Sequence, residues 1–207
     1  MRKFLLLITV FVAFTSCSNP AANKPAATVG NAAQESNTPK PASTETLAIT
    51  PENSKVEFVA SKVTRSHYGS FKQFSGTVGL ADNVANSSVK IDIETASVEV
   101  DDLDLTAHLK TPDFFDVAKF PKANFTSTKI DAAGGDNYTV TGNFDLHGVK
   151  KSISFPATIK VAADNVAVDA EFAINRKDFG IVYAGKADDL IRDQVVIKLN
   201  LRVPRKK

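Results

Sequence analysis

The sequence predicts an all-β protein, a closed antiparallel barrel of about eight strands with one short helical insertion, and three observations support this fold class. From residue 47 onwards, apolar residues recur at every second position, which is the period of a strand with one buried face. Gly, Asn and Asp residues separate these runs at hairpin spacing. The single cysteine, Cys17, precedes this region, so disulfide bonds are excluded as a source of its stability.

Eight runs of alternating residues are predicted to be strands. They are Val56–Ala60, Phe74–Leu80, Val89–Ile93, a weaker run from Phe125, Tyr138–Leu146, Ile153–Val161, Val166–Ile174 and Val195–Val203. Such strands either pair as two sheets or close into one barrel, and closure is favoured because it removes unpaired edges. A membrane-spanning barrel is disfavoured, because the sequence has no Trp and only 3 Tyr to form aromatic girdles.

The connections are predicted to be tight turns, apart from one helical insertion at about residues 102–119. Asp102 or Asp104 can cap the first helix, Pro112 starts a second short helix, and Pro121 ends the insertion. The turns fall at Asp82-Asn83, at 134–137, at His147-Gly148 and at Asp164-Asn165.

The N-terminus is predicted to be a lipoprotein signal peptide over residues 1–16. Arg2 and Lys3 precede an apolar run over residues 4–13, which is too short to span a bilayer. A small residue before Cys17 resembles the bacterial lipobox, in which the cysteine sulfur carries the lipid. The alternative is an ordinary signal peptide followed by an incidental cysteine.

The composition of the rest of the chain predicts a tether, one folded domain and a short tail. Residues 17–46 are rich in Ala, Pro, Ser, Thr and Asn and contain no aromatic residue, so the lipidated cysteine is expected to begin a disordered tether. Residues 47–204 form the barrel domain, and residues 205–207 form a solvated basic tail. The net charge is only +2, which gives no electrostatic footprint for nucleic acid.

The apolar faces contain a series of small residues that predicts an internal cavity. Ala60, Gly76, Gly142, Ala157 and Ala170 each lie between larger apolar residues, so inward-facing strands would leave a lengthwise hollow walled by phenylalanines. The alternative is that the small residues let the strands bend. The candidate ligand-binding residues are Phe58, Ala60, Phe74, Gly76, Val78, Ile91, Val140, Gly142, Phe144, Phe155, Ala157, Val168, Ala170, Phe172, Ile197 and Leu199, with His108, Phe114 and Phe115 as rim contacts.

Several motifs resemble the YceI-like family over about residues 47–204. They are Ser54–Phe58, Tyr68–Phe71 with Phe74–Gly76, His108–Phe115 continuing to Pro121, Phe125–Thr128, Gly142–Lys150 and Arg176–Gly180. The resemblance implies a lipocalin-like eight-stranded barrel in the bacterial envelope. It also implies a polyisoprenoid or isoprenoid-quinone ligand.

The sequence departs from the family pattern at three places. Ser61 replaces a histidine, Leu105-Thr106 replaces an Arg-Asp pair, and Ser152 replaces a proline. The first two changes remove polar groups near the helical insertion. Any head-group contact that relatives make there is therefore in doubt, whereas the apolar wall is retained.

No enzyme, metal site or cofactor is predicted. The three histidines, His67, His108 and His147, have no metal-ligand spacing, and no nucleophile elbow or phosphate loop is present. His108 is interpreted as a loop-bracing residue and His67 as an exposed or rim residue.

Three functional hypotheses follow. The first is an envelope protein anchored to the membrane through Cys17, facing the periplasm and holding an isoprenoid or similar long-chain lipid. The second is an interaction or stress module whose barrel is filled by its own side chains. The third is an enzyme with His108 or His67 as acid and base. Whether the protein is a homodimer is left open.

Overall fold

The computed structural model describes residues 19–33 and 45–205, so the predicted signal peptide and Cys17 lie outside the described residues. All eight predicted strands are present, as β3 (Ser54–Ser61), β5 (Phe74–Leu80), β6 (Ser88–Glu94), β8 (Lys122–Ala132), β9 (Asn137–Leu146), β10 (Val149–Val161), β11 (Asn165–Asn175) and β14 (Gln194–Pro204). The structure adds the shorter strands β1 (Thr28–Asn31), β2 (Glu45–Ile49), β4 (Ser66–Phe71), β7 (Val98–Val100), β12 (Gly185–Lys186) and β13 (Asp189–Leu190). The prediction of about eight strands is therefore too low. The additional strands are short or lack a regular alternation.

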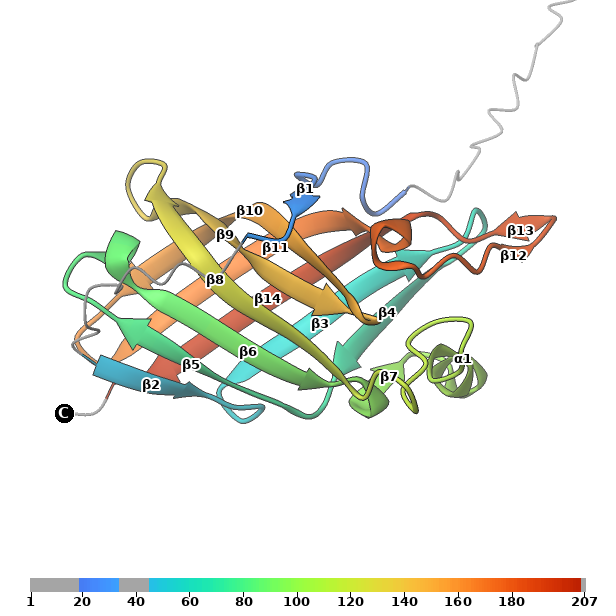
Figure 1. Cartoon of the computed structure of the whole chain (residues 1–207), viewed down its shortest axis with the longest axis horizontal. Helices are drawn as coiled ribbons and strands as arrows, with labels where there is room; N and C mark the ends of the chain where they lie inside the picture. The colour runs from blue at the N-terminus through green and yellow to red at the C-terminus, as the bar shows by residue number, and fades with distance from the viewer. Residues whose placement is uncertain (1–18, 34–44, 206–207) are drawn as a thin grey trace, which may run out of the picture.

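One antiparallel sheet curls into an elongated barrel (Figure 1), which confirms the predicted fold class. Its strand order is β2-β5-β6-β8-β9-β10-β11-β14-β3-β4-β7, with β1 paired to β10. The hydrogen-bonded order has two ends, so the ladder among the described residues is not closed as predicted. Near one end, Arg205 Nε donates to Glu45 Oε2 on β2 at 2.8 Å. Arg205 is thus bound to the barrel instead of belonging to a solvated tail.

The apolar faces of the strands point inward, as the alternation predicts. Phe58 and Phe172 are buried, as are Leu201 and Val203 at the other end of the barrel. The predicted turn at His147-Gly148 has positive φ at both residues (54° and 73°), which is the backbone of a type I′ hairpin turn.

The helical insertion is shorter than predicted. Helix α1 spans Leu103–Leu109, and Asp102 caps it by accepting a hydrogen bond from the Leu105 N–H at 3.0 Å. The expected second helix after Pro112 is wrong, because residues 111–119 form a series of turns in which Asp116 has a φ of 44°. Three short 3-10 helices complete the described elements, namely η1 (Val84–Asn86), η2 (Thr95–Ser97) and η3 (Arg176–Phe179).

The N-terminal segment over residues 19–33 is part of the barrel wall. Strands β10 and β11 pair only from Thr158 to Val161, and β1 pairs with the earlier part of β10. On the other side of this gap, the Ala27 N–H donates to the Ala173 carbonyl at 2.8 Å and the Ala173 N–H donates to the Pro25 carbonyl at 2.9 Å. The segment therefore fills a slot between two strands.

Side chains also hold this segment. Asn143 on β9 is buried and forms two hydrogen bonds of 2.9 Å with the backbone N–H and C=O of Ala33. Lys24 Nζ lies 2.7 Å from Glu171 Oε2 on β11. The predicted disordered tether is thus wrong for residues 19–33, because tertiary partners satisfy their backbone groups. Residues 34–44 lie outside the described part of the chain.

No α-helix in the described ranges, 19–33 and 45–205, has the length and hydropathy needed to cross a bilayer.

Candidate functional site: an apolar cavity at one end of the barrel

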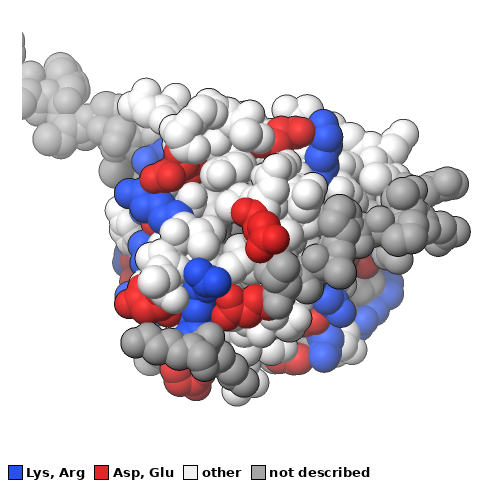
Figure 2. Space-filling view, turned by 90° about the vertical axis from the view of Figure 1, so that its left-hand side faces the viewer, with Lys and Arg blue, Asp and Glu red and all other residues white. Residues whose placement is uncertain are grey.

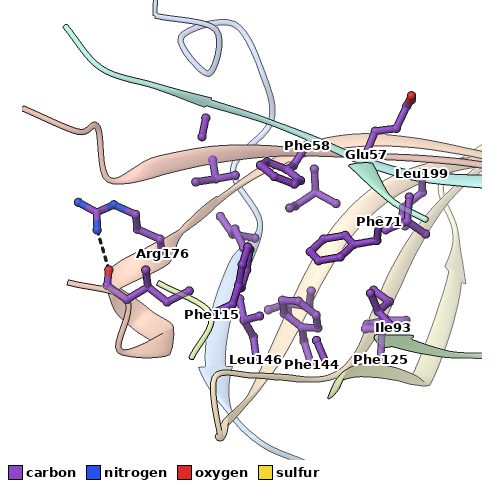
Figure 3. A pocket seen from close by; sticks show the side chains of 18 of the residues that line it. Glu57, Phe58, Phe71, Ile93, Phe115, Phe125, Phe144, Leu146, Arg176 and Leu199 are labelled. Carbon is purple, nitrogen blue, oxygen red and sulfur yellow. Dashed lines mark hydrogen bonds between the residues drawn. The ribbon is translucent and has the colours of Figure 1, made fainter. Parts of the chain in front are cut away.

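An apolar cavity of about 140 Å³ lies in the part of the barrel nearest α1, whose residue Leu109 lines it. Figure 3 shows the side chains around this cavity. On β14 it is lined by Val195, Ile197 and Leu199, whereas Leu201 and Val203 further along the strand do not reach it. Of the predicted ligand-binding and rim residues, those that line the cavity are Phe58, Ala60, Ile91, Phe144, Phe155, Phe172, Ile197, Leu199, Phe114 and Phe115.

Aromatic rings form both ends of this cavity. Phe155 and Phe172 stack at 4.1 Å between ring centroids with an interplanar angle of 10°, where the cavity meets the filled part of the barrel. Nearer α1, the rings of Phe58, Phe71 and Phe115 pack against one another at 5.6 to 6.5 Å. The rest of the wall is aliphatic and aromatic, including Phe125 and Phe144, so the space suits a hydrocarbon chain.

The remaining predicted wall residues do not line the cavity. They are Phe74, Gly76, Val78, Val140, Gly142, Ala157, Val168 and Ala170, together with the predicted rim residue His108. Six of them are buried in the hydrophobic core, namely Phe74, Val78, Val140, Ala157, Val168 and Ala170. Phe74 lies at the cavity end, because it pairs with the lining residue Ile93, whereas the others show that the far part of the barrel is filled by the side chains of the protein itself.

The small residues do not create the cavity in the way that the sequence indicates. A Cβ added at Gly142 would overlap the Phe125 ring and the Thr126 carbonyl oxygen, and one at Gly76 would overlap the Lys90 carbonyl oxygen. These positions are small because neighbouring groups already occupy the space. Only Ala60 of the five small residues lines the cavity, so the predicted lengthwise hollow is wrong.

The cavity wall contains little charge. Glu57 is part of the wall, but its carboxylate points away from the cavity (Figure 3). The Arg176 guanidinium donates to the carbonyls of Ile181 at 2.8 Å and Arg192 at 3.2 Å, which turns the cation towards the loop backbone. Burial lowers the pKa of Arg176 below its ordinary value. No carboxylate or free cation among the described lining residues is thus directed at a bound ligand.

The family-like motif at residues 176–180 builds this end of the barrel. Phe179 is fully buried with its ring 5.2 Å from that of Phe144, and Gly180 ends η3 with a φ of 75°. A left-handed residue at this position favours glycine. The motif therefore holds the loop that carries Ile181 against the cavity.

Several lining residues were missed by the sequence analysis. Val56, Ile93, Ile153, Ile174 and Val195 lie on alternating apolar faces, so the pattern that identified their neighbours could have found them. In contrast, Phe71, Leu109, Ile181 and Ile191 come from segments without alternation, and no local signal marks them.

Two histidines lie outside the cavity, each beside a carboxylate. His67 Nδ1 is 2.8 Å from Asp101 Oδ1, and His108 Nε2 is 2.8 Å from Asp113 Oδ2. His67 is only 6% exposed, so of its two interpretations the exposed residue is wrong, whereas it borders a surface depression beside α1 as a rim residue would. Neither histidine lines the cavity, so geometry does not support acid–base chemistry on a substrate held there.

His108 braces two loops, as predicted. Its ring packs edge-on against Phe114 at 5.0 Å and Tyr183 at 5.2 Å, which joins the segment after α1 to the loop after η3. Over the described parts of the chain, no three His, Cys, Asp or Glu residues are grouped as a metal site would require.

Fold and site together define an antiparallel β-barrel protein with an apolar internal pocket. The chain belongs to the YceI-like family, because the YceI-like domain matches residues 47–203. Protein YceI of Salmonella arizonae is 36% identical over 121 residues, which cover 55% of this chain and 63% of the relative. The same values hold for Protein YceI of Salmonella newport. The match thus spans less than two thirds of the length of these relatives.

Solved structures have the same fold. Burkholderia cenocepacia BcnA superposes with a TM-score of 0.70 and 28% identity, covering 74% of this chain and 98% of that chain. A polyisoprenoid binding domain from Saccharophagus degradans gives a TM-score of 0.64 and 20% identity, covering 78% of this chain and 98% of that chain. The barrel is therefore the YceI-like, lipocalin-like barrel.

Proposed function

We propose that this protein binds an isoprenoid or similar long-chain lipid in the barrel cavity and is anchored to an envelope membrane through Cys17, facing the periplasm. The observation that carries the proposal is an aromatic and aliphatic cavity with no ionised group directed into it. The relative from Saccharophagus degradans, described as a polyisoprenoid binding domain, supports the ligand class. Membrane anchoring rests on the signal sequence and Cys17 alone.

The cavity dimensions set the part of the lipid that is held. On β3, the inward residues Val56, Phe58 and Ala60 line the cavity. At about 3.3 Å per residue, these four steps correspond to a depth of about 13 Å. The volume sets a tighter limit, because an engineered cavity of about 150 Å³ holds a benzene molecule, so about 140 Å³ encloses roughly six carbons of the chain.

Burying this part of the chain supplies much of the free energy of binding. At about 0.8 kcal/mol per CH₂ group, six carbons contribute roughly 5 kcal/mol before the cost of association, and micromolar affinity, about 8 kcal/mol, requires further contacts of the chain outside the cavity. The head group and any further chain would extend towards α1. Specificity for the chain is therefore expected to exceed specificity for the head group.

The competing hypothesis, a barrel filled by its own side chains, describes only the far part of this barrel. Mass spectrometry of organic extracts from protein purified out of its own membrane would separate the two hypotheses. A stoichiometric prenyl lipid, or saturable binding of farnesol by the delipidated protein, supports the proposal. Protein that contains no lipid and does not bind farnesol would overturn it.

A further inference from the structure

The N-terminal segment leaves the barrel at the cavity end. Asn19, the first described residue, borders a surface depression together with Arg176, Ile191 and Arg192, and Arg176 and Ile191 also line the cavity. Figure 1 shows the segment, in blue, crossing the barrel towards the end that carries α1 and the β12–β13 hairpin, whereas the C-terminus lies at the opposite end. The segment is fixed here, because Ala21 is only 3% exposed and packs against the outer face of the barrel.

This attachment leaves little chain between the barrel and the anchor. Cys17 precedes Asn19 by two residues, so their Cα atoms are at most about 7.6 Å apart. If Cys17 carries the lipid, as the proposed function holds, the acyl chains begin within this reach of the cavity end. The fixed segment shortens the predicted 30-residue tether to two residues, which restricts how the barrel can turn on the membrane.

Exposed apolar side chains gather at the same end. Leu103 on α1 is 86% exposed, Val182 is 63%, Leu190 is 49% and Val63 is 48%. They come from four separate segments around the cavity end, and Val182 and Leu190 directly adjoin the lining residues Ile181 and Ile191. We refer to Val63, Leu103, Val182 and Leu190 as the apolar rim. Of the other two large exposed apolar residues, Val161 lies at the far end of β10 and Tyr68 lies on β4.

Charge does not distinguish this end of the molecule. Near the rim, Lys62 pairs with Asp189 at 3.3 Å and Lys177 pairs with Asp193 at 3.0 Å, so cations and carboxylates are mixed there. Figure 2 shows the opposite end, where acidic and basic side chains are interspersed as well. The apolar rim and the position of the chain exit are therefore what set this end apart, and they fit a lipid bilayer rather than a charged macromolecule.

We propose that the barrel docks on the bilayer surface with its apolar rim in the interfacial layer, so that the cavity opens towards the membrane that supplies its lipid. This inference rests on the proposed function for the anchor and for the ligand, and it adds the orientation of the barrel. A lipid anchor combined with interfacial apolar side chains supplies two membrane signals instead of one. The hydrocarbon chain of a bilayer lipid then enters the cavity without crossing water.

The orientation can be measured on the full-length lipidated protein with a single fluorescent label. Lipidation consumes the Cys17 thiol, so Val182→Cys and Val161→Cys each introduce one reactive thiol, on the same residue type at opposite ends of the barrel. In phosphatidylcholine vesicles containing a spin-labelled lipid, fluorescence at position 182 should fall roughly twofold, because interfacial residues reach about 5–10 Å into the bilayer boundary. Fluorescence at position 161 should not change. High salt should leave this contrast intact, because the proposed contact with the bilayer is made by apolar side chains.

A second measurement addresses the rim itself. The double variant Leu103→Gln with Val182→Gln should take up a prenyl lipid from vesicles several-fold more slowly. Its affinity for dispersed farnesol should remain unchanged, because neither residue lines the cavity. The matched control is Val161→Gln, which should have neither effect.

The outcomes separate this inference from the proposed function. Equal quenching at positions 182 and 161, or quenching at position 161 alone, would overturn the proposed orientation. A rim that binds a second copy of the protein and shows no quenching at position 182 would overturn it as well. Mass spectrometry of the same sample reports the lipid on Cys17 and the lipid in the cavity. Loss of farnesol binding contradicts the ligand assignment whatever the quenching shows.

Discussion

Replacing Ala60 by leucine is expected to weaken lipid binding without unfolding the barrel. Ala60 lies on the inward face of β3 and lines the cavity of about 140 Å³. Leucine adds three carbons that take the place of about three chain carbons of the ligand. At about 0.8 kcal/mol for each, the loss is roughly 2.4 kcal/mol, which is about a 50-fold weaker affinity.

The stability of the variant should be maintained or increased. An empty cavity of this size costs roughly 3 kcal/mol at about 24 cal/mol per Å³, and leucine fills part of it. Calorimetric titration with farnesol would give the affinity, and thermal unfolding would give the stability of the same sample. A folded Ala60→Leu variant with unchanged affinity would refute the assignment of the cavity as the ligand site.

Ala157→Leu is the matched control. Ala157 is 5% exposed in the filled part of the barrel and does not line the cavity. Leucine there should overpack the core and destabilise the protein by about 1–3 kcal/mol, with the affinity of the folded fraction retained. The lengthwise hollow predicted from the small residues requires the opposite result, in which Ala157→Leu blocks binding as Ala60→Leu does.

Three further predictions concern the cavity wall and the N-terminal segment. Gly69→Ala should lower farnesol affinity, measured by the same titration, because the added Cβ overlaps the Phe58 ring and pushes it into the cavity. Asn143→Ala removes two hydrogen bonds to Ala33, so amide exchange of residues 25–33 should be about tenfold faster, from a loss of roughly 1–2 kcal/mol. Hydrogen bonds from Lys24 and Lys198 lower the pKa of Glu171 below its ordinary value of 4.5. The ionised carboxylate therefore helps to hold the segment at every pH above 4.5, and this stabilisation is lost as the pH falls through the lowered pKa. Amide exchange of the segment measured across this acid range should therefore accelerate as the pH falls.

Each of these predictions has a control. Gly30→Ala adds a Cβ with nothing within 4 Å, so it should leave farnesol affinity unchanged. Asn200→Ala removes a side-chain hydrogen bond to Asp169, away from the segment, and should not alter exchange of residues 25–33. Glu171→Gln should abolish the acid dependence of exchange, and acid dependence that persists in this variant would contradict the assignment to Glu171.

The strands could be predicted from the sequence because their signal is local. A barrel strand buries alternate side chains, so residues such as Phe172 and Ile174 on β11 reveal their inward face by spacing alone. The same spacing gave eight of the residues that line the cavity. The hairpin at His147-Gly148 and the cap of α1 at Asp102 are also set by neighbouring residues.

The position of the cavity could not be predicted, because neighbouring strands decide which space stays empty. Gly142 indicates missing volume along its own strand, yet the Phe125 ring from β8 occupies that volume. The N-terminal segment is the second case. Its composition is that of a disordered chain, and it is ordered because β10 and β11 diverge and leave unpaired backbone groups, such as those of Ala173, for it to bind.

The sequence by itself determined the all-β class and the inward apolar faces, because each depends on residues close together in the chain. Tertiary structure alone decided that the far part of the barrel is filled, that the cavity lies beneath α1, and that residues 19–33 complete the wall beside it. Those features depend on tertiary contacts between side chains and backbone groups that are far apart in the sequence. The spacing of residues within one strand carries no information about such contacts.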